Sequence, residues 1–265
     1  MLAKVMKDVI CIARSPFPIS RRLQLLKGLG STMVGRGKLF GWNIKHLGRP
    51  SMVLLYSEIF ARQGYRFASP KQNPVILDCG ANIGMATLYF KWLYPKAQIL
   101  AFEPDPLTFG LLKENTSGNR LEDVVTQNIA LGKDESEIDF HVPEPGSLMM
   151  SAVAGRSTGT GTTIRVACRR LSTFITGEID LLKLDIEGME EPVLDELAAS
   201  GKLSLVREMV VEVHHNLPNS PSRLSRILAL LEHNGFRYHL VNFYSASLSD
   251  CSAFQDVIIH AQRQM

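Results

Sequence analysis

Residues 75–84 read VILDCGANIG, an apolar run that stops at Asp78 and passes into a turn with two glycines. An apolar run of this kind suits a strand that is buried on both faces of a sheet. Apolar residues then recur at helical spacing from Ile83 through Leu88 to Tyr94. The order strand, glycine turn, helix is the opening unit of a parallel α/β sheet.

Downstream of this unit, short apolar runs alternate with helical patterns to the end of the chain. The runs predict seven strands, at residues 75–78, 98–102, 124–129, 179–186, 209–213, 238–243 and 254–260. Helical patterns lie between them, for example at 106–115 and 191–200. We therefore predict an α/β fold with a doubly wound, mostly parallel seven-stranded sheet.

One insert departs from this rhythm. Residues 138–142 and 163–168 have the pattern of two strands, which predicts a β-hairpin-like insert. The linker between them, residues 143–162, is rich in Gly, Ser and Thr, so we expect it to be flexible. A linker of this length is either a surface loop without a function or a lid over a substrate.

The first 70 residues lack the strand and helix alternation. Glycines from Gly28 to Gly41 break the segment, and Ser51 is placed to cap a helix through Phe60 that Gly64 would stop. We predict a mostly helical extension at residues 1–70, a possible substrate cap, ahead of a ligand-binding domain at 71–265.

The charge balance and the cysteines exclude several classes of protein. There are 29 basic and 26 acidic residues, a net charge of +3, without the concentrated basic face that nucleic acid requires. The four cysteines lack the spacing of a zinc site or a disulfide scaffold. No stretch approaches the roughly 20 apolar residues of a membrane span. We expect a cytoplasmic protein that acts on a small molecule, of an oligomeric state that the sequence does not indicate.

The turn after the first strand has the features of a nucleotide site. Gly80, Asn82 and Gly84 allow the backbone to come close to a ligand. Asp78 would repel the pyrophosphate of a dinucleotide but suits the ammonium group of a methionine moiety, whose carboxylate can take backbone N–H groups at the helix start. Glu103, after the second strand, is placed to accept hydrogen bonds from both hydroxyls of a ribose. Together these residues predict an adenosine that carries an amino acid.

Two further contacts are less specific. Asn128 and Ala130 follow the third predicted strand, where an adenine ring would lie. The alternative for Asp78 and Glu103 is the capping of loops, and for the glycines it is ordinary turn geometry.

Four segments occur in a specific order: VILDCGANIG, AFEPDP, NIALG and DLLKLDIEGMEEPVL, which begin at residues 75, 101, 128 and 180. Together, over about residues 74–215, they resemble the successive motifs of the FkbM family of S-adenosylmethionine-dependent methyltransferases. The resemblance implies a class I, Rossmann-like methyltransferase sheet with S-adenosylmethionine as cofactor. It also implies a hydroxyl acceptor on a sugar, a glycolipid or a polyketide-type natural product. The chain departs from the family pattern at Ser172, where an Asp is usual.

Ionisable residues gather at the ends of the fourth and fifth predicted strands. Alternation places Lys183, Asp185 and, if the strand extends, Glu187 on one face of the fourth strand, and Glu212 with His214 on one face of the fifth. Pairing of Lys183 with Asp185 would lower the cost of burying both charges. Because ligands bind at the carboxyl edge of such sheets, we expect these groups to converge on the site of methyl transfer.

A hydroxyl acceptor benefits from a base, and His214, with an ordinary pKa of about 6.5, is the candidate. Asp185 or Glu187 could orient the acceptor or take its proton, with Lys183 beside them. Alternatively, Asp185, Glu187, Glu212 and His214 could hold Mg²⁺ or a similar ion that lowers the pKa of the acceptor. The alternative for His214 is a buried core histidine without a catalytic role. Glu190 and Glu191 are expected to favour the dipole at the start of their helix.

Two other functions remain at this point. A non-catalytic module could retain the same fold, although buried ionisable groups would then serve no chemistry. A nicotinamide-dependent oxidoreductase would need a third glycine within residues 85–88, which is missing, and Asp78 opposes it.

Overall fold

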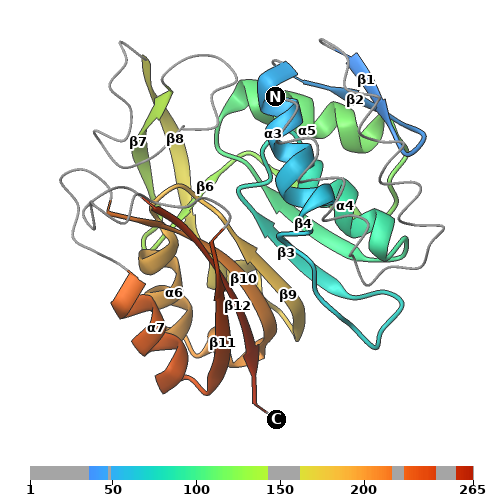
Figure 1. Cartoon of the computed structure of the whole chain (residues 1–265). Helices are drawn as coiled ribbons and strands as arrows, with labels where there is room; N and C mark the ends of the chain where they lie inside the picture. The colour runs from blue at the N-terminus through green and yellow to red at the C-terminus, as the bar shows by residue number, and fades with distance from the viewer. Residues whose placement is uncertain (1–35, 47–48, 143–161, 217–223, 243–254, 265) are drawn as a thin grey trace, which may run out of the picture.

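A central sheet of seven strands organises the molecule (Figure 1). The computed structural model describes residues 36–46, 49–142, 162–216, 224–242 and 255–264. The strands are β3 (Val75–Cys79), β4 (Gln98–Phe102), β5 (Val124–Gln127), β9 (Ile179–Leu184), β10 (Val206–His215), β11 (Phe236–Val241) and β12 (Gln255–Arg263). Their order is β11-β12-β10-β9-β3-β4-β5, and only β12 runs antiparallel to its neighbours. The predicted doubly wound, mostly parallel seven-stranded sheet is confirmed.

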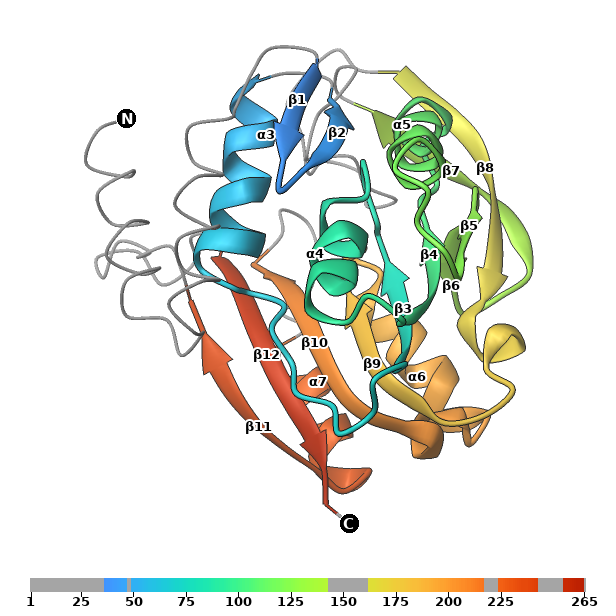
Figure 2. The same ribbon diagram turned by 90° about the vertical axis from the view of Figure 1, so that its right-hand side faces the viewer.

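Helices cover both faces of the sheet (Figures 1 and 2). One face carries α3 (Arg49–Leu55), the π-helix η1 (Tyr56–Ala61), α4 (Met85–Leu93) and α5 (Pro106–Ser117). The other carries α6 (Glu190–Ala199) and α7 (Leu224–His233), with the 3₁₀-helices η2 (Leu171–Phe174) and η3 (Lys202–Leu205). The strands at the centre are therefore buried on both sides, which explains why β9 is apolar along most of its length.

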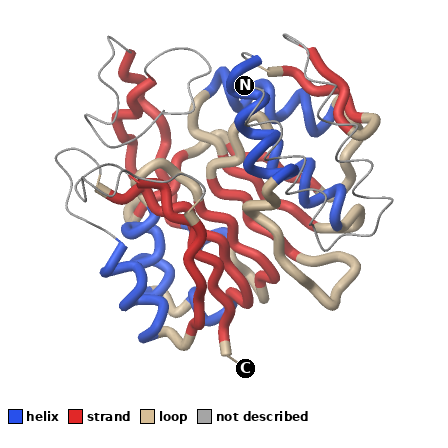
Figure 3. The backbone as a smooth tube through the Cα atoms, in the orientation of Figure 1, coloured by secondary structure: helices blue, strands red, loops and turns tan. Residues whose placement is uncertain are grey.

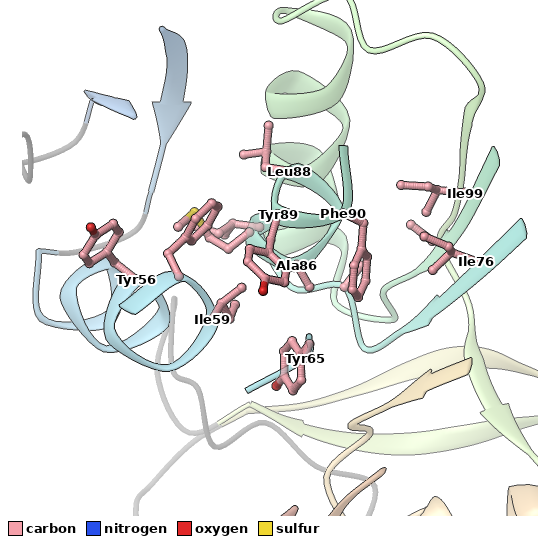
Figure 4. Close-up of a cluster of buried hydrophobic side chains, with 14 of the residues drawn as sticks. Tyr56, Ile59, Tyr65, Ile76, Ala86, Leu88, Tyr89, Phe90 and Ile99 are labelled. Carbon is pink, nitrogen blue, oxygen red and sulfur yellow. The ribbon is translucent and has the colours of Figure 1, made fainter. Parts of the chain in front are cut away.

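The segment ahead of β3 belongs to the main core. Tyr56, Ile59 and Tyr65 lie beside Tyr89 and Phe90 of α4 (Figure 4). Burial of these large side chains fixes η1 against α4, because apolar area removed from water contributes about 25 cal/mol per Å². The upstream residues are thus an integral layer of the domain, joined through a shared apolar cluster.

The prediction of a mostly helical extension is wrong for residues 36–45. They form a hairpin of β1 (Arg36–Leu39) and β2 (Trp42–Lys45). Phe40 and Gly41 have φ values of 52° and 95°, and two positive φ values in succession make the tight turn that suits a hairpin. Ser51 is also not a helix cap, because α3 begins at Arg49. Residues 1–35, which the same prediction covered, lie outside the described residues.

The insert forms a small sheet of its own (Figure 3). β7 (Ser136–Val142) and β8 (Thr162–Arg170) are antiparallel, which confirms the β-hairpin-like insert. The third strand, β6 (Ala130–Gly132), runs parallel to β8 and was not expected. Residues 143–161 of the predicted flexible linker lie outside the described residues. Among the residues that the structure describes, no helix is long and apolar enough to cross a membrane.

Candidate active site

The glycine turn lies directly against the end of β9. Gly80 has a φ of 80°, and a Cβ atom there would come within 1.7 Å of the backbone oxygen of Asp185. Gly84, at φ 90°, precedes α4, and a Cβ atom there would lie 2.9 Å from a methyl carbon of Leu112. Glycine is therefore required at 80 by a close backbone approach as well as by φ. The predicted cofactor turn and Asp185 are immediate neighbours.

Glu103 joins this turn to the end of β4. One carboxylate oxygen accepts from the N–H of Asn82 at 2.9 Å, and the other accepts from the N–H of Asp105 at 2.9 Å. Burial raises the pKa of Glu103 to about 7, although the two backbone hydrogen bonds act in the opposite direction. Two oxygens at the lip of a glycine turn suit a pair of ribose hydroxyls, which is the predicted role.

Asp78 lies beneath the turn. Its side chain is fully buried, and it accepts a hydrogen bond of 2.6 Å from the Thr87 hydroxyl on α4. The ammonium of Lys183 lies 3.5 Å from its other oxygen. Asp78 thus ties the end of β3 to the first turn of α4 and to β9. Its contact with the ammonium of a methionine moiety stays a prediction.

Lys183 connects the two halves of the site. Its ammonium donates to the backbone oxygens of Gly80 at 2.6 Å and Cys79 at 3.1 Å, and it lies 3.4 Å from Asp185. The expected pairing with Asp185 is therefore present. Burial by itself would lower the pKa of Lys183, but the carboxylates of Asp185 and Asp78 raise it above its ordinary value. A charged Lys183 holds the glycine turn against the end of β9.

Tyr65 completes the site from outside the sheet, and the sequence analysis missed it. Its hydroxyl lies 3.0 Å from an oxygen of Asp185 and 3.0 Å from an oxygen of Glu212. Its ring lies over the Lys183 ammonium, 5.2 Å from the centroid. Burial, Asp185 and Glu212 together raise the pKa of Tyr65 well above its usual value, so it keeps its proton. An isolated tyrosine in the segment before β3 gave no pattern that could have identified it.

The pKa values of the Asp185 and Glu212 carboxyl groups are shifted in opposite directions. Burial would raise the pKa of Asp185, but Lys183 and His214 hold it below its usual range. Burial and the nearby Asp185 raise the pKa of Glu212 well above its usual range. Asp185 therefore loses its proton more readily than Glu212, and the two carboxyl groups suit a shared hydroxyl between them.

His214 lies buried between two carboxylates at the end of β10. Its Nδ1 is 3.1 Å from Glu190, and its Nε2 is 3.2 Å from Glu187. Glu190 also accepts from the backbone N–H groups of Gly188 at 2.9 Å and Ile186 at 3.2 Å, which fix its position. Burial would raise the pKa of Glu190, but His214 holds it below its usual value.

The sequence analysis expected Glu190 only to favour the dipole of its helix. The structure adds its contact with His214, which lies 24 residues away in the chain, too far for a local pattern to indicate. Strand alternation does not bring Glu187 to His214, because β9 ends at Leu184 and Glu187 has a positive φ of 61°. A turn after the strand, not an extension of it, brings Glu187 to the site.

Several predicted residues come together at this edge. Single ligand atoms of Asp185, Glu212 and His214 all lie within 4.8 Å of one another. Asn128 donates to the backbone oxygen of Glu103 at 2.8 Å, and Ala130 is buried at the start of β6. Their contact with an adenine ring stays a prediction.

Comparisons with known proteins identify methyltransferases as relatives of this chain. Residues 78–238 match the family described as the methyltransferase FkbM domain. The chain is 34% identical over 214 residues to methyltransferase sdnD of Sordaria araneosa, which covers 69% of this chain and 81% of that protein. It is 28% identical over 230 residues to 31-O-demethyl-FK506 methyltransferase FkbM of Streptomyces tacrolimicus, which covers 74% of this chain and 86% of that protein.

Solved structures of similar proteins include a crystal structure of methyltransferase FkbM from Methylobacillus flagellatus KT. It aligns with a TM-score of 0.48 at 14% identity and covers 80% of this chain and 53% of that one.

Proposed function

This chain belongs to the FkbM methyltransferase family, and from that premise we propose that it methylates a hydroxyl group of a sugar, a glycolipid or a polyketide-type natural product. S-adenosylmethionine supplies an electrophilic methyl group on a sulfonium that is already a good leaving group. Alignment of the acceptor and removal of its proton are then the main tasks of the protein. A relative named for O-methylation of a natural product supports a hydroxyl acceptor.

The residues at the glycine turn fit the cofactor. Gly80 packs the turn directly against the Asp185 backbone, where no side chain would fit, which holds the turn beside the end of β9. Glu103 offers two carboxylate oxygens at the lip of the turn, and α4 begins there without a side-chain cap on its N–H groups. Free N–H groups at a helix start favour a carboxylate ligand.

The observation that carries the proposal is the position of His214 between Glu190 and Glu187, beside Asp185. A Glu190 carboxylate that accepts from Nδ1–H orients the ring, so that Nε2, on the side of Glu187 and Asp185, is the ring nitrogen that would take the proton of an acceptor hydroxyl. The carboxylates of Asp185, Glu187, Glu190 and Asp256 all lie within 3.9 Å of a ring nitrogen and stabilise the imidazolium that results. His214 is thus the general base, and Glu190 is the residue that orients it.

The acceptor oxygen is held by the neighbouring carboxylates. We assign orientation of the acceptor to Asp185 and Glu212, which already share a hydroxyl from Tyr65. A second neutral hydroxyl has the same hydrogen-bonding chemistry as the phenol. Tyr65 also supports the proposal that residues upstream of 71 cap the acceptor site.

A divalent cation such as Mg²⁺ is the second candidate for activation of the acceptor. Asp185, Glu212 and His214 can present three ligand atoms to one ion, and Glu187 lies next to His214. Removal of metal by EDTA distinguishes the two mechanisms. The base mechanism predicts unchanged activity, whereas the metal mechanism predicts a loss that Mg²⁺ restores.

The proposed function is tested first by calorimetric titration with S-adenosylhomocysteine. Wild type should bind with a Kd in the micromolar range, roughly −8 kcal/mol, and Glu103→Ala should bind more weakly. NAD in a parallel titration should not bind. Labelled S-adenosylmethionine with a panel of sugars, glycolipids and polyketide alcohols then identifies the acceptor. Binding of NAD without S-adenosylhomocysteine would refute the proposal.

A further inference from the structure

Asn115, in the last turn of α5, makes three side-chain hydrogen bonds. Its carbonyl oxygen accepts from the N–H of Lys45 at 2.7 Å, and its amide donates to the backbone oxygen of Lys45 at 2.9 Å. The same amide donates to the backbone oxygen of Ile83, in the glycine turn, at 2.8 Å. The side chain is 1% exposed, so these partners replace water at both of its donors.

Asn119, four residues later and just beyond the end of α5, provides a direct comparison. It accepts from the N–H of Asn43 and donates to the backbone oxygen of Asn43, each at 2.8 Å. The two asparagines therefore pair with alternate residues of β2 as another strand would, and they attach the hairpin to α5 (Figure 1). Asn119 makes its remaining bond to α5 itself, at Asn115. Of this pair, Asn115 is the member that reaches the glycine turn.

The glycine turn depends on α5 for support. Gly84, the residue before α4, has no side chain to cap the helix. Leu112 of α5 lies close beneath Gly84, and Asn115 holds the backbone oxygen of Ile83. On the other side, Glu103 and Asn82 hold two N–H groups of the same turn. Loss of the Asn115 amide would leave a buried carbonyl without this donor, which costs free energy and allows the turn to shift.

We propose that Asn115 is a positioning residue for the cofactor turn, through which the β1–β2 hairpin and α5 together set the affinity for S-adenosylmethionine. This inference rests on the proposed function, because the turn is taken to bind that cofactor. The hairpin precedes the residues that match the family domain, 78–238, so this support comes from outside the matched segment.

The test compares Asn115→Ala with Asn119→Ala. Both substitutions remove one reciprocal pair with β2, but only the first releases Ile83. Titration with S-adenosylhomocysteine at 25 °C should show binding about tenfold weaker for Asn115→Ala and within about twofold of wild type for Asn119→Ala. Hydrogen exchange of the amides from Ile83 to Thr87, without ligand, should be faster in Asn115→Ala alone. If Asn115→Ala does not fold, Asn115→Ser keeps one donor at this position and should show a smaller loss of the same kind.

The possible results separate a failure of the role of Asn115 from a failure of the proposed function. Equal weakening by both substitutions would show that attachment of the hairpin matters and would overturn a specific role for the bond to Ile83. Unchanged affinity and exchange in a folded Asn115 variant would overturn the inference and leave the proposed function intact. A wild-type protein that does not bind S-adenosylhomocysteine would instead refute the proposed function.

Discussion

The carboxyl groups at the C-terminal edge of the sheet differ in pKa from one residue to the next. Lys183 holds the pKa of Asp185 below its usual range, while burial and Asp185 raise the pKa of Glu212, which lies 3.0 Å from the same phenol. Glu103 is different from both, because burial brings its pKa to about 7. Burial and the nearest charges therefore shift the pKa of each carboxyl group differently.

Glu103 should make cofactor affinity depend on pH. Ribose hydroxyls donate to a carboxylate, so binding favours the ionised form, which is lost as pH falls through about 7. Between pH 8 and pH 6 the Kd for S-adenosylhomocysteine should rise about tenfold, since a single proton competes. Glu103→Gln should bind weakly at both pH values, without this change. Calorimetry measures both, with Glu122→Gln, an exposed glutamate at the other end of β5, as the control. A wild-type Kd that is constant over this range would contradict the role of Glu103.

His214 and Glu190 should act as a unit in catalysis. His214→Gln removes the base, so kcat should fall about 100-fold or more. Glu190→Gln leaves the ring without its carboxylate partner and should lower kcat by a smaller factor. The double variant should be little worse than His214→Gln, because residues that act together are not additive. Steady-state kinetics with the identified acceptor measures kcat. S-adenosylhomocysteine affinity within about twofold of wild type separates this effect from misfolding, and an unchanged kcat in His214→Gln would refute the assignment of the base.

At the scale of elements, the site depends on how closely β3 and β9 approach. The backbone of Gly80 and the carbonyl of Asp185 leave no space for a methyl group. Lys183 then bridges the same two segments through the backbone oxygens of Cys79 and Gly80. The pairing of two parallel strands thus fixes the distance between the cofactor turn and the acidic end of β9.

Gly80→Ala should test this close approach, with Gly41→Ala as the matched control. Both glycines have positive φ, so alanine at either position costs about 1–2 kcal/mol. A Cβ atom at Gly41 meets nothing within 4 Å, whereas at Gly80 it meets the Asp185 oxygen at 1.7 Å. Gly80→Ala should therefore lose about 3 kcal/mol more than Gly41→Ala in urea unfolding, and it should lose S-adenosylhomocysteine binding. Equal losses in the two variants would show that the turn can move aside.

At the scale of the whole molecule, the segment before β3 is joined both to the core and to the active site. Its apolar side chains pack on α4, and Tyr65 reaches Asp185 and Glu212 across 120 and 147 residues of chain. Phe67 packs next to Tyr94, and Ser69 donates to the Tyr94 hydroxyl at 2.9 Å. The upstream segment is therefore held at the site by Tyr65 and at the C-terminal end of α4 by Phe67 and Ser69.

Tyr65→Phe should affect the acceptor and spare the cofactor. Loss of the phenol hydroxyl removes the group between Asp185 and Glu212, so kcat/KM for the acceptor should fall about tenfold. Affinity for S-adenosylhomocysteine should not change, because Glu103 and the glycine turn are untouched. Tyr94→Phe removes a phenol hydroxyl from the same region without contact to these carboxylates, and it should retain wild-type kcat/KM. A similar loss in both variants would point to packing of the segment instead.

Ligand binding should stabilise the whole domain. A ligand that binds only the folded state at 100 times its Kd adds about 2.7 kcal/mol. For a chain of this size the melting temperature should rise by about 5–10 °C with S-adenosylhomocysteine. Scanning calorimetry measures the shift, and NAD at the same concentration should produce none. Absence of a shift at saturating S-adenosylhomocysteine would contradict binding to the folded domain.

The sequence by itself determined the sheet, the glycine turn and the acidic ends of two strands. These features arise from local rules: an apolar run suits a buried strand, glycine permits positive φ, and alternation places Glu212 and His214 on one face. The motif order was sufficient to identify the family and its cofactor. Glu103 and Lys183 were likewise located by their position after or within a strand.

Only the tertiary structure decided which distant groups meet. Tyr65 with Asp185, His214 with Glu190, and Asn115 with Ile83 are separated by 120, 24 and 32 residues. Local periodicity carries no information about such pairs, because they depend on strand order and on how helices pack over the sheet. The hairpin at residues 36–45 pairs locally, but its attachment was decided the same way: β2 bonds Asn115 of α5 and Asn119 just after that helix.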